Sequence, residues 1–132
     1  MKELGLNELK TPAEVDAVLA GKSKANSKSA PDSVLVYVNS MCGCAYASAR
    51  PALKLALKHK KLPDKLTTVF AGQDMEATAK AREHFLPYPP SSPSFYLLKS
   101  GKVVFAIERP GILHRDPQEI AESLGKAFDE FC

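Results

Sequence analysis

The chain of 132 residues carries 18 lysines and arginines against 15 aspartates and glutamates, a formal net charge of +3. So small an excess, with no basic stripe interleaved with aromatic side chains, argues against nucleic-acid binding. No apolar run approaches the roughly 20 residues that span a bilayer, so we expect no membrane association. The length suits a single domain over residues 1–132, large enough to bury a core without crosslinks.

The N-terminal half begins with a capped helix. Thr11 stands before Pro12, and Glu14 follows where a capping box needs an acid, so we predict a helix to about Ala20. Residues 22–33 are rich in Ser, Lys and Asn without apolar periodicity, which predicts a surface loop. Val34–Val38 is continuously apolar, as expected of a strand covered on both faces.

The next stretch has the composition of a helix. It runs from Cys44 to about Lys60, with Leu53 and Leu57 marking its buried face. Pro51 lies inside this stretch and is expected to kink it, because proline removes a backbone hydrogen bond.

The rest of the chain alternates strands and helices. We predict a strand over 66–70, a helix over 75–85, irregular structure over 87–93, a hairpin of strands 94–98 and 103–107, and a final helix. Asp116 caps that helix, which carries apolar residues at helical spacing: Ile120, Leu124, Phe128 and Phe131. This order resembles the thioredoxin-like fold, an α/β fold with a mixed central sheet flanked by helices, here with an extra N-terminal helix.

Cysteine usage points to thiol chemistry. Three cysteines cannot form a disulfide framework, and residues 1–10 hold no apolar run of signal-peptide length. We therefore expect a cytoplasmic protein, in which paired thiols are catalytic, redox-sensing or metal-binding.

Cys42-Gly43-Cys44 follows the apolar strand and opens the predicted helix. The N-terminal end of a helix lowers a thiol's pKa, and a disulfide between residues i and i+2 is strained and easily reduced. We interpret Cys42 as the attacking thiolate. Cys44 either resolves the resulting adduct or tunes the first thiol while an external reductant resolves it.

Pro93, just before the predicted hairpin, is a second mark of the thioredoxin superfamily. By that resemblance its peptide bond is cis, an isomer that X-Pro reaches at only about 0.5–1 kcal/mol. A cis bond would bring Ser92 beside the sulfurs, with its backbone available to an extended substrate. Gly43, Ser92 and Pro93 are thus the predicted substrate-binding residues.

Further stretches resemble the bacilliredoxin family of thioredoxin-like proteins with a CxC motif. They are residues 38–44, 49–52, 68–74 with 76–78, 89–95 and 127–132. The resemblance implies a thiol-disulfide oxidoreductase that removes bacillithiol, a small thiol, from S-thiolated proteins, with weak isomerase or reductase activity. It implies bacillithiol as co-substrate, no bound cofactor, S-thiolated or disulfide-containing proteins as partners, and a thiol reductase system for recycling.

Other roles stay open beside this interpretation. The same thiols, with Met41 and Cys132, would suit a non-catalytic copper or zinc site, although a structural zinc site needs four ligands. The three histidines are scattered singly and are expected on the surface: His59, His84 and His114. Cys132 is either a frayed terminal residue or an auxiliary thiol.

Two polar residues near the motif also have an ordinary and a functional interpretation. Arg50 is the cation nearest to the cysteines in sequence, and it either lies on a helix surface or assists the thiolate or a substrate carboxylate. Asp74 is expected to cap the following helix, whereas the family resemblance favours a functional interpretation in which the loop of residues 71–74 borders the thiol pocket.

Overall fold

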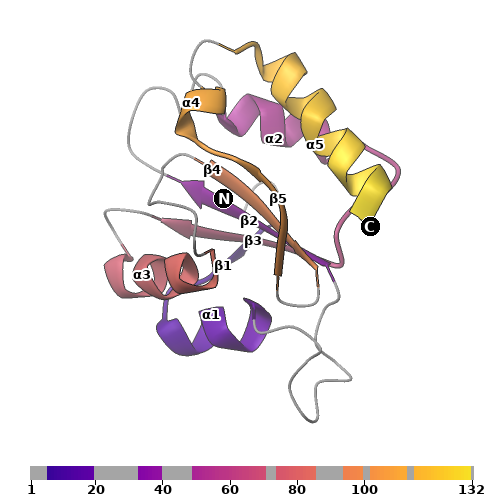
Figure 1. The fold of residues 1–132 in the computed structure, drawn as a ribbon. Helices are drawn as coiled ribbons and strands as arrows, with labels where there is room; N and C mark the ends of the chain where they lie inside the picture. Colours follow the sequence, from indigo (N-terminus) through magenta and orange to yellow (C-terminus); the bar gives the residue numbers. More distant parts are fainter. Residues whose placement is uncertain are drawn as a thin grey trace.

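The computed structural model describes residues 6–19, 33–39, 49–70, 74–85, 94–99, 102–112 and 115–131. The elements follow in the order β1 (Asn7–Glu8), α1 (Pro12–Leu19), β2 (Ser33–Asn39), α2 (Arg50–Ala56), β3 (Lys65–Phe70), α3 (Met75–His84), β4 (Ser94–Lys99), β5 (Lys102–Ile107), α4 (Arg109–Ile112) and α5 (Pro117–Phe131) (Figure 1). Over these ranges, none of the helices has the length and apolar character that a membrane crossing requires.

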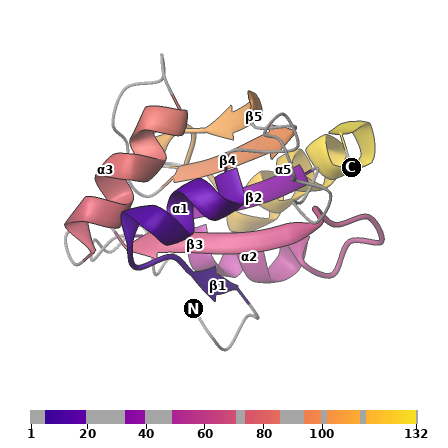
Figure 2. The same ribbon diagram turned by 90° about the horizontal axis from the view of Figure 1, so that it is seen from below.

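The centre of the molecule is a mixed sheet in the order β1-β3-β2-β4-β5. β3 runs parallel to both β1 and β2, whereas β4 is antiparallel to β2 and forms a hairpin with β5. α2 and α5 cover one face of this sheet, and α1 and α3 cover the other (Figures 1 and 2). This arrangement confirms the predicted α/β fold, including the helix before the central strand.

β2 separates two hydrophobic cores because successive side chains of a strand point to opposite faces. Leu35 and Tyr37 belong to the core beneath α2 and α5, together with Phe128. Val36 belongs to the core beneath α1 and α3, together with Ala77. All seven residues of β2 are buried, which explains its uninterrupted apolar run.

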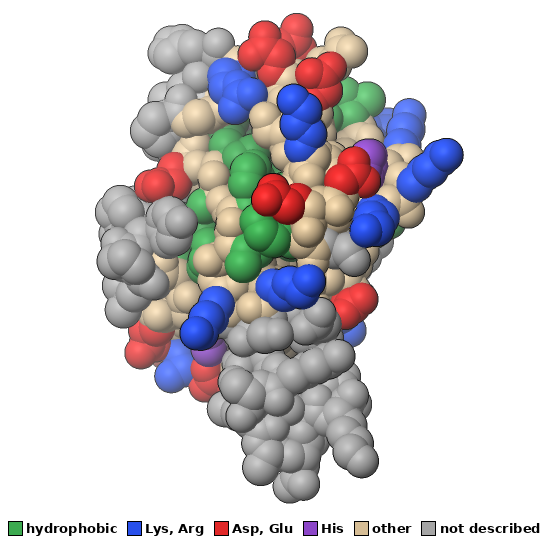
Figure 3. Space-filling model, turned by 45° about the vertical axis from the view of Figure 1, so that its right-hand side comes forward, with side chains coloured by type: hydrophobic (Ala, Val, Ile, Leu, Met, Phe, Trp, Pro, Cys, Tyr) green, Lys and Arg blue, Asp and Glu red, His purple; other side chains and the backbone are tan. Residues whose placement is uncertain are grey.

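The edge strand β5 carries a β-bulge. Leu97 pairs with Phe105, but Leu98 pairs with Val103, so Val104 is an extra residue. Val104 and Phe105 are half-buried and pack on the core that lies beneath α2 and α5. On this side of the molecule, hydrophobic side chains form a strip bordered by charged ones (Figure 3). A bulge makes an edge strand a poorer template for pairing with another chain.

The predicted capping residues are confirmed at two helices. The N–H of Glu14 donates to Oγ1 of Thr11 at 3.2 Å before α1, and the hydroxyl of Thr11 donates to the Glu14 carboxylate. The N–H of Gln118 donates to Oδ1 of Asp116 at 3.2 Å before α5. The bonds from the two N–H groups each satisfy a backbone donor that the helix itself leaves without a partner.

α2 differs from its prediction. It ends at Ala56, earlier than expected, because the chain then turns more tightly: the N–H groups of Lys58 and His59 donate to carbonyls three residues back. Pro51 is the second residue of α2 as the structure describes it, and Ala49 before this helix also has helical backbone angles, so the kink expected at Pro51 stays a prediction. Residues 44–48 of the predicted helix lie outside the described ranges.

Two short elements were not predicted, β1 and α4, since two and four residues are too few to show periodicity.

Asp16 links α1 to α3. Its Oδ1 lies 2.9 Å from Nε2 of His84 and its Oδ2 lies 3.6 Å from Nζ of Lys80. The hydrogen bond with His84 is the main reason that the pKa of Asp16 is lowered; partial burial opposes the shift and Lys80 adds to it.

Asp16→Asn is therefore expected to destabilise the protein at neutral pH and to lose this effect in acid. A carboxylate whose pKa falls on folding contributes stability above its unfolded value, about 3.9, and loses it as the pH falls through the folded value. Urea unfolding at about pH 6 and about pH 2.5 measures the difference between the two proteins at each pH. A difference that is unchanged in acid would show that Asp16 acts through packing.

Candidate functional site

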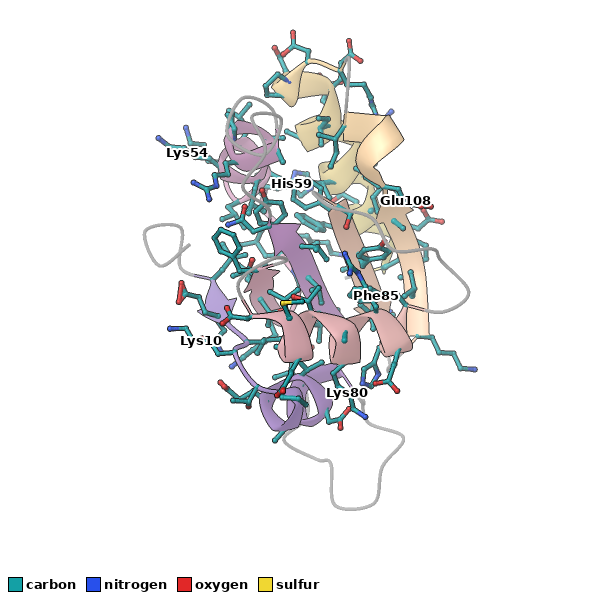
Figure 4. The ribbon with its side chains drawn as sticks, turned by 90° about the vertical axis from the view of Figure 1, so that its left-hand side faces the viewer. Lys10, Lys54, His59, Lys80, Phe85 and Glu108 are labelled. Carbon is teal, nitrogen blue, oxygen red and sulfur yellow. The ribbon has the colours of Figure 1, made fainter. Side chains whose placement is uncertain are left out.

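Three connections leave or enter the sheet at the same end of its strands, which we call the sheet edge, and two of them carry predicted site residues. β2 ends at Asn39, which pairs with Phe70 at the end of β3. β4 begins beside these strand ends, because its first residue, Ser94, pairs with Val38, the residue before Asn39. The chain therefore leaves this edge into residues 40–48 and 71–73, and it returns here from residues 86–93. Figure 4 views this edge, with α2 above the sheet and α3 below it.

Ligands of open α/β sheets bind beyond the carboxyl ends of parallel strands. The edge where β2 and β3 end is therefore the position that the fold itself favours for a site.

The predicted catalytic and binding residues lie outside the described residues: Cys42, Gly43, Cys44, Ser92, Pro93 and Cys132. Met41 and His114 lie outside them as well. What the structure describes is the part of the fold from which these segments extend. Cys42 follows the end of β2 by three residues, and Pro93 immediately precedes β4.

A buried polar cluster lies at the end of β2. Asn39 is only 2% exposed, and its Oδ1 accepts a hydrogen bond from the hydroxyl of Tyr37 at 3.0 Å. Nη2 of Arg50 donates to the same oxygen at 3.4 Å. The cluster thus joins the last residue of β2 to the first residue of α2.

Sequence reasoning missed Asn39 and Tyr37. The available signal was a polar residue at the end of an otherwise apolar strand, directly before the Cys-containing segment. A buried amide in that place requires hydrogen-bond partners. Arg50, for which a surface position was one of the two expectations, is partly buried and bound to Asn39.

Aromatic stacking extends the cluster toward β4. The rings of Tyr37 and Phe95 lie 5.0 Å apart between centroids and are inclined by 22°. Both side chains are fully buried. Phe95 is the second residue of β4, so the packing of Tyr37 connects the strand before the cysteines with the strand after Pro93.

Small residues allow α2 to approach the sheet closely. Ala52 and Ala56 are buried together with Leu53, and α2 packs on α5 beside them. Alanine loses no side-chain entropy on burial and favours the helix. The first turn of α2, which follows the cysteine-containing residues 40–48 in the sequence, is consequently held against the core at the sheet edge.

Asp74 occupies the N-cap position of α3, as predicted, but its carboxylate makes no capping hydrogen bond there. Its backbone makes the hydrogen bonds at this helix start instead. The N–H of Asp74 donates to the carbonyl of Phe70 at 2.9 Å, and the carbonyl of Asp74 accepts from Oγ1 of Thr78 at 2.9 Å. The carboxylate side chain therefore sits at the same sheet edge without a capping role.

The two described histidines pair with aspartates on helix faces. Nε2 of His59 lies 3.0 Å from Oδ1 of Asp129, and His84 pairs with Asp16. Within the described ranges, no three His, Cys, Asp or Glu side chains come together as metal ligands would.

A groove of about 680 Å³ lies between the second half of α2 and α5. Its charged lining is balanced, with Lys58 and Lys126 against Glu122 and Asp129, and its apolar part includes Leu55. The lining contains no thiol or hydroxyl nucleophile, and it includes no residue of the sheet edge. We therefore assign the candidate site to the edge and not to the groove.

Comparison with known proteins gives consistent results. The family profile described as "Disulphide isomerase" matches residues 1–132. Bacilliredoxin BH2759 of Halalkalibacterium halodurans is 49% identical over 132 residues, which cover 100% of this chain and 85% of that protein. Bacilliredoxin GK2368 of Geobacillus kaustophilus is 48% identical over 130 residues, covering 98% and 83%.

Solved structures show the same fold at low identity. A putative oxidoreductase with a thioredoxin fold matches with a TM-score of 0.63 and 14% identity, covering 92% of both chains. Thioredoxin of Fasciola hepatica matches with a TM-score of 0.58 and 20% identity, covering 92% of this chain and 98% of that one. The architecture described above is therefore the thioredoxin fold.

Proposed function

Since this chain belongs to the bacilliredoxin family, we propose that it is a thiol-disulfide oxidoreductase that removes bacillithiol from S-thiolated proteins. The observation that carries the proposal is the match over the whole chain to proteins named bacilliredoxin, together with a Cys-Gly-Cys motif in this sequence. The topology supports it, because the motif begins three residues after a strand whose carboxyl end lies where ligands of open α/β sheets generally bind.

The proposed reaction is an exchange of disulfide partners. The Cys42 thiolate attacks the bacillithiol sulfur of a protein–bacillithiol disulfide. A new Cys42–bacillithiol disulfide forms, and the cysteine of the substrate protein leaves as a thiolate. The Cys44 thiolate then attacks Cys42, which releases bacillithiol as a thiolate and leaves a Cys42–Cys44 disulfide. A dithiol reductase supplies the two electrons that return both cysteines to thiols.

The other predicted residues have supporting roles in this proposal. The backbone of Ser92, before Pro93, would pair with the extended substrate, and Gly43 would leave room for it beside the sulfurs. Cys132 would act as an auxiliary thiol. An external thiol is the alternative to Cys44 for resolving the adduct. Weak disulfide isomerase or reductase activity would follow from the same exchange chemistry.

Transfer of bacillithiol to Cys42 is the direct test. Reduced, metal-free protein is incubated with a bacillithiol-thiolated protein and, as control, with the same protein glutathionylated. We expect an adduct on Cys42 that forms at least about tenfold faster from the bacillithiol substrate, the factor given by about 1.4 kcal/mol of differential transition-state binding. Intact and peptide mass spectrometry locates the adduct.

A specific result would contradict the proposal. If no adduct forms and the thiols react no faster than free cysteine, the chain is not an exchange enzyme, and binding of copper(I) or zinc by the same thiols becomes the function to test.

A further inference from the structure

We propose that two copies of this chain associate through their outer β5 strands, side by side and antiparallel, about a two-fold axis at Phe105. This inference goes beyond the proposed function and does not depend on the thiol chemistry. Two observations carry it. β5 is apolar on both faces of the sheet, and opposite charges stand at its two ends, where Lys102 opens the strand and Glu108 follows it.

The two outer strands of the described sheet differ in length and composition. β1 consists of two polar residues, and the carboxylate of its Glu8 lies 3.7 Å from Nζ of Lys10. A short, charged outer strand discourages pairing with another chain. β5 has six residues, and the five that follow Lys102 are all apolar. Of these two strands, β5 is therefore the one with the composition of a contact surface.

β5 is apolar on both faces because helices cover both faces of the sheet. Val103 and Ala106 pack on the core beneath α1 and α3. Val104 and Phe105 pack on the core beneath α2 and α5. All four remain half-buried, since β4 flanks them on one side and no strand of the described sheet flanks them on the other. A second copy beside β5 would remove their remaining apolar surface from water, which favours association.

The charges at the ends of β5 match in one orientation of the two copies. In a two-fold contact, if residue i touches residue j, then j also touches i. An antiparallel arrangement centred on Phe105 places Lys102 of each copy opposite Glu108 of the other, because both lie three residues from the centre. A parallel arrangement would place like charges opposite each other, which is unfavourable.

Both of these side chains are available for such a contact. Lys102 is exposed and Glu108 is half-buried. Among the described residues, neither side chain forms an ion pair within its own chain. The antiparallel arrangement therefore forms two intermolecular ion pairs, one on each side of an apolar centre, and this self-complementarity identifies a second copy of the chain as the partner.

The β-bulge at Val104 determines how the two copies touch. It interrupts the regular strand, so a long hydrogen-bonded ladder with another strand is disfavoured. Its extra residue also shortens the path from Phe105 to Lys102 to about 7 Å, against about 10 Å from Phe105 to Glu108. The flexible four-carbon stem of lysine spans that difference. Apolar side chains and ion pairs, and not a continuous ladder, therefore hold the two copies together.

Sedimentation equilibrium of the full chain over about 5–500 µM measures this association. A reductant is present throughout, so that the three cysteines of each chain cannot link two copies. A contact made by one strand is smaller than a standard interface, so we expect a weak dimer with a Kd of about 10–100 µM. A protein that stays monomeric at about 500 µM would overturn the proposal and leave β5 to a different partner.

Charge reversal tests the orientation of the two copies. Lys102→Glu and Glu108→Lys each put like charges at both ends of the contact, so each alone should raise the Kd at least about tenfold. An equimolar mixture of the two variants restores opposite charges at both ends, because the acid introduced at position 102 then meets the lysine introduced at position 108. We expect the mixture to associate with a Kd within about threefold of the parent value.

Lys54→Glu is the matched control, because it makes the same change in net charge as Lys102→Glu. Lys54 is exposed on α2, and Figure 4 shows it on the opposite side of the molecule from Glu108. This variant should keep the parent Kd within about twofold, since its charge lies far from the contact. Circular dichroism verifies that each variant is folded.

Two further results would contradict the proposal. If the parent associates but neither reversal on β5 weakens the dimer more than Lys54→Glu does, the copies meet through another surface. If both reversals weaken the dimer but their mixture does not recover, Lys102 does not lie opposite Glu108. Bacillithiol transfer plays no part in these measurements, so the proposed function is tested separately.

Discussion

Cys42→Ser is expected to abolish the transfer of bacillithiol, with a fall in rate of at least about a hundredfold. A serine hydroxyl at neutral pH is far less nucleophilic than a thiolate, and removing the nucleophile removes the covalent step itself. The measurement is the release of free bacillithiol from a thiolated protein under multiple turnover, with a reductant present.

Cys44→Ser is the matched variant for this experiment. It should still take up bacillithiol on Cys42 in a single turnover, but the adduct should persist, since the thiol that would displace it is absent. Uptake that is lost in Cys44→Ser but retained in Cys42→Ser would make Cys44, and not Cys42, the attacking residue. Full turnover by Cys44→Ser would instead assign the second step to an external thiol.

Phe128→Ala should lower the free energy of unfolding by about 3–5 kcal/mol, a larger loss than we expect for Asp16→Asn or Met75→Ala. Phe128 is fully buried on α5 beneath α2, its ring centroid lies 6.4 Å from that of His59, and it belongs to the core that contains Tyr37. Truncation leaves a cavity that well-packed neighbours fill only in part. Urea unfolding followed by circular dichroism measures the change; the chain has no tryptophan for fluorescence.

Met75→Ala provides the contrast on the surface. Met75 is 71% exposed at the start of α3, so its replacement should change the unfolding free energy by no more than about 0.5 kcal/mol. A similar small effect of Phe128→Ala would mean that α5 contributes little to the core beneath it.

The predicted elements agree with the structure where the sequence has a clear periodicity or cap. The apolar run at 34–38 lies within β2, and the spacing of Ile120, Leu124 and Phe128 matches the buried face of α5. The prediction was less accurate for α2, because a stretch rich in Ala, Leu and Lys does not reveal where i→i−4 bonds give way to tighter turns. Asp74 shows a similar limit: its position as a cap was correct, but the backbone and not the carboxylate makes the bonds.

The candidate site likewise has a part that the sequence predicts and a part that only the structure shows. Sequence alone predicts a nucleophile and its partner, Cys42 and Cys44, from the spacing of two thiols after a buried strand, and those residues remain predictions. It also directs attention to Arg50, the nearest cation, without indicating what fixes it. The hydrogen bond from Arg50 to Asn39 was not predictable, because Arg50 comes eleven residues after Asn39 and the contact depends on how α2 packs on β2.

The sequence by itself determined the order of the longer helices and strands, the two-sided burial of β2 and the family to which the chain belongs. These follow from local propensity, from the alternation of side chains and from motifs that are contiguous along the chain. Only the tertiary structure decided that the ends of β2 and β3 and the start of β4 form one edge, and that Asn39 there binds the first residue of α2. Strand register and helix packing are set by the burial of side chains distant in sequence, so no local pattern specifies them.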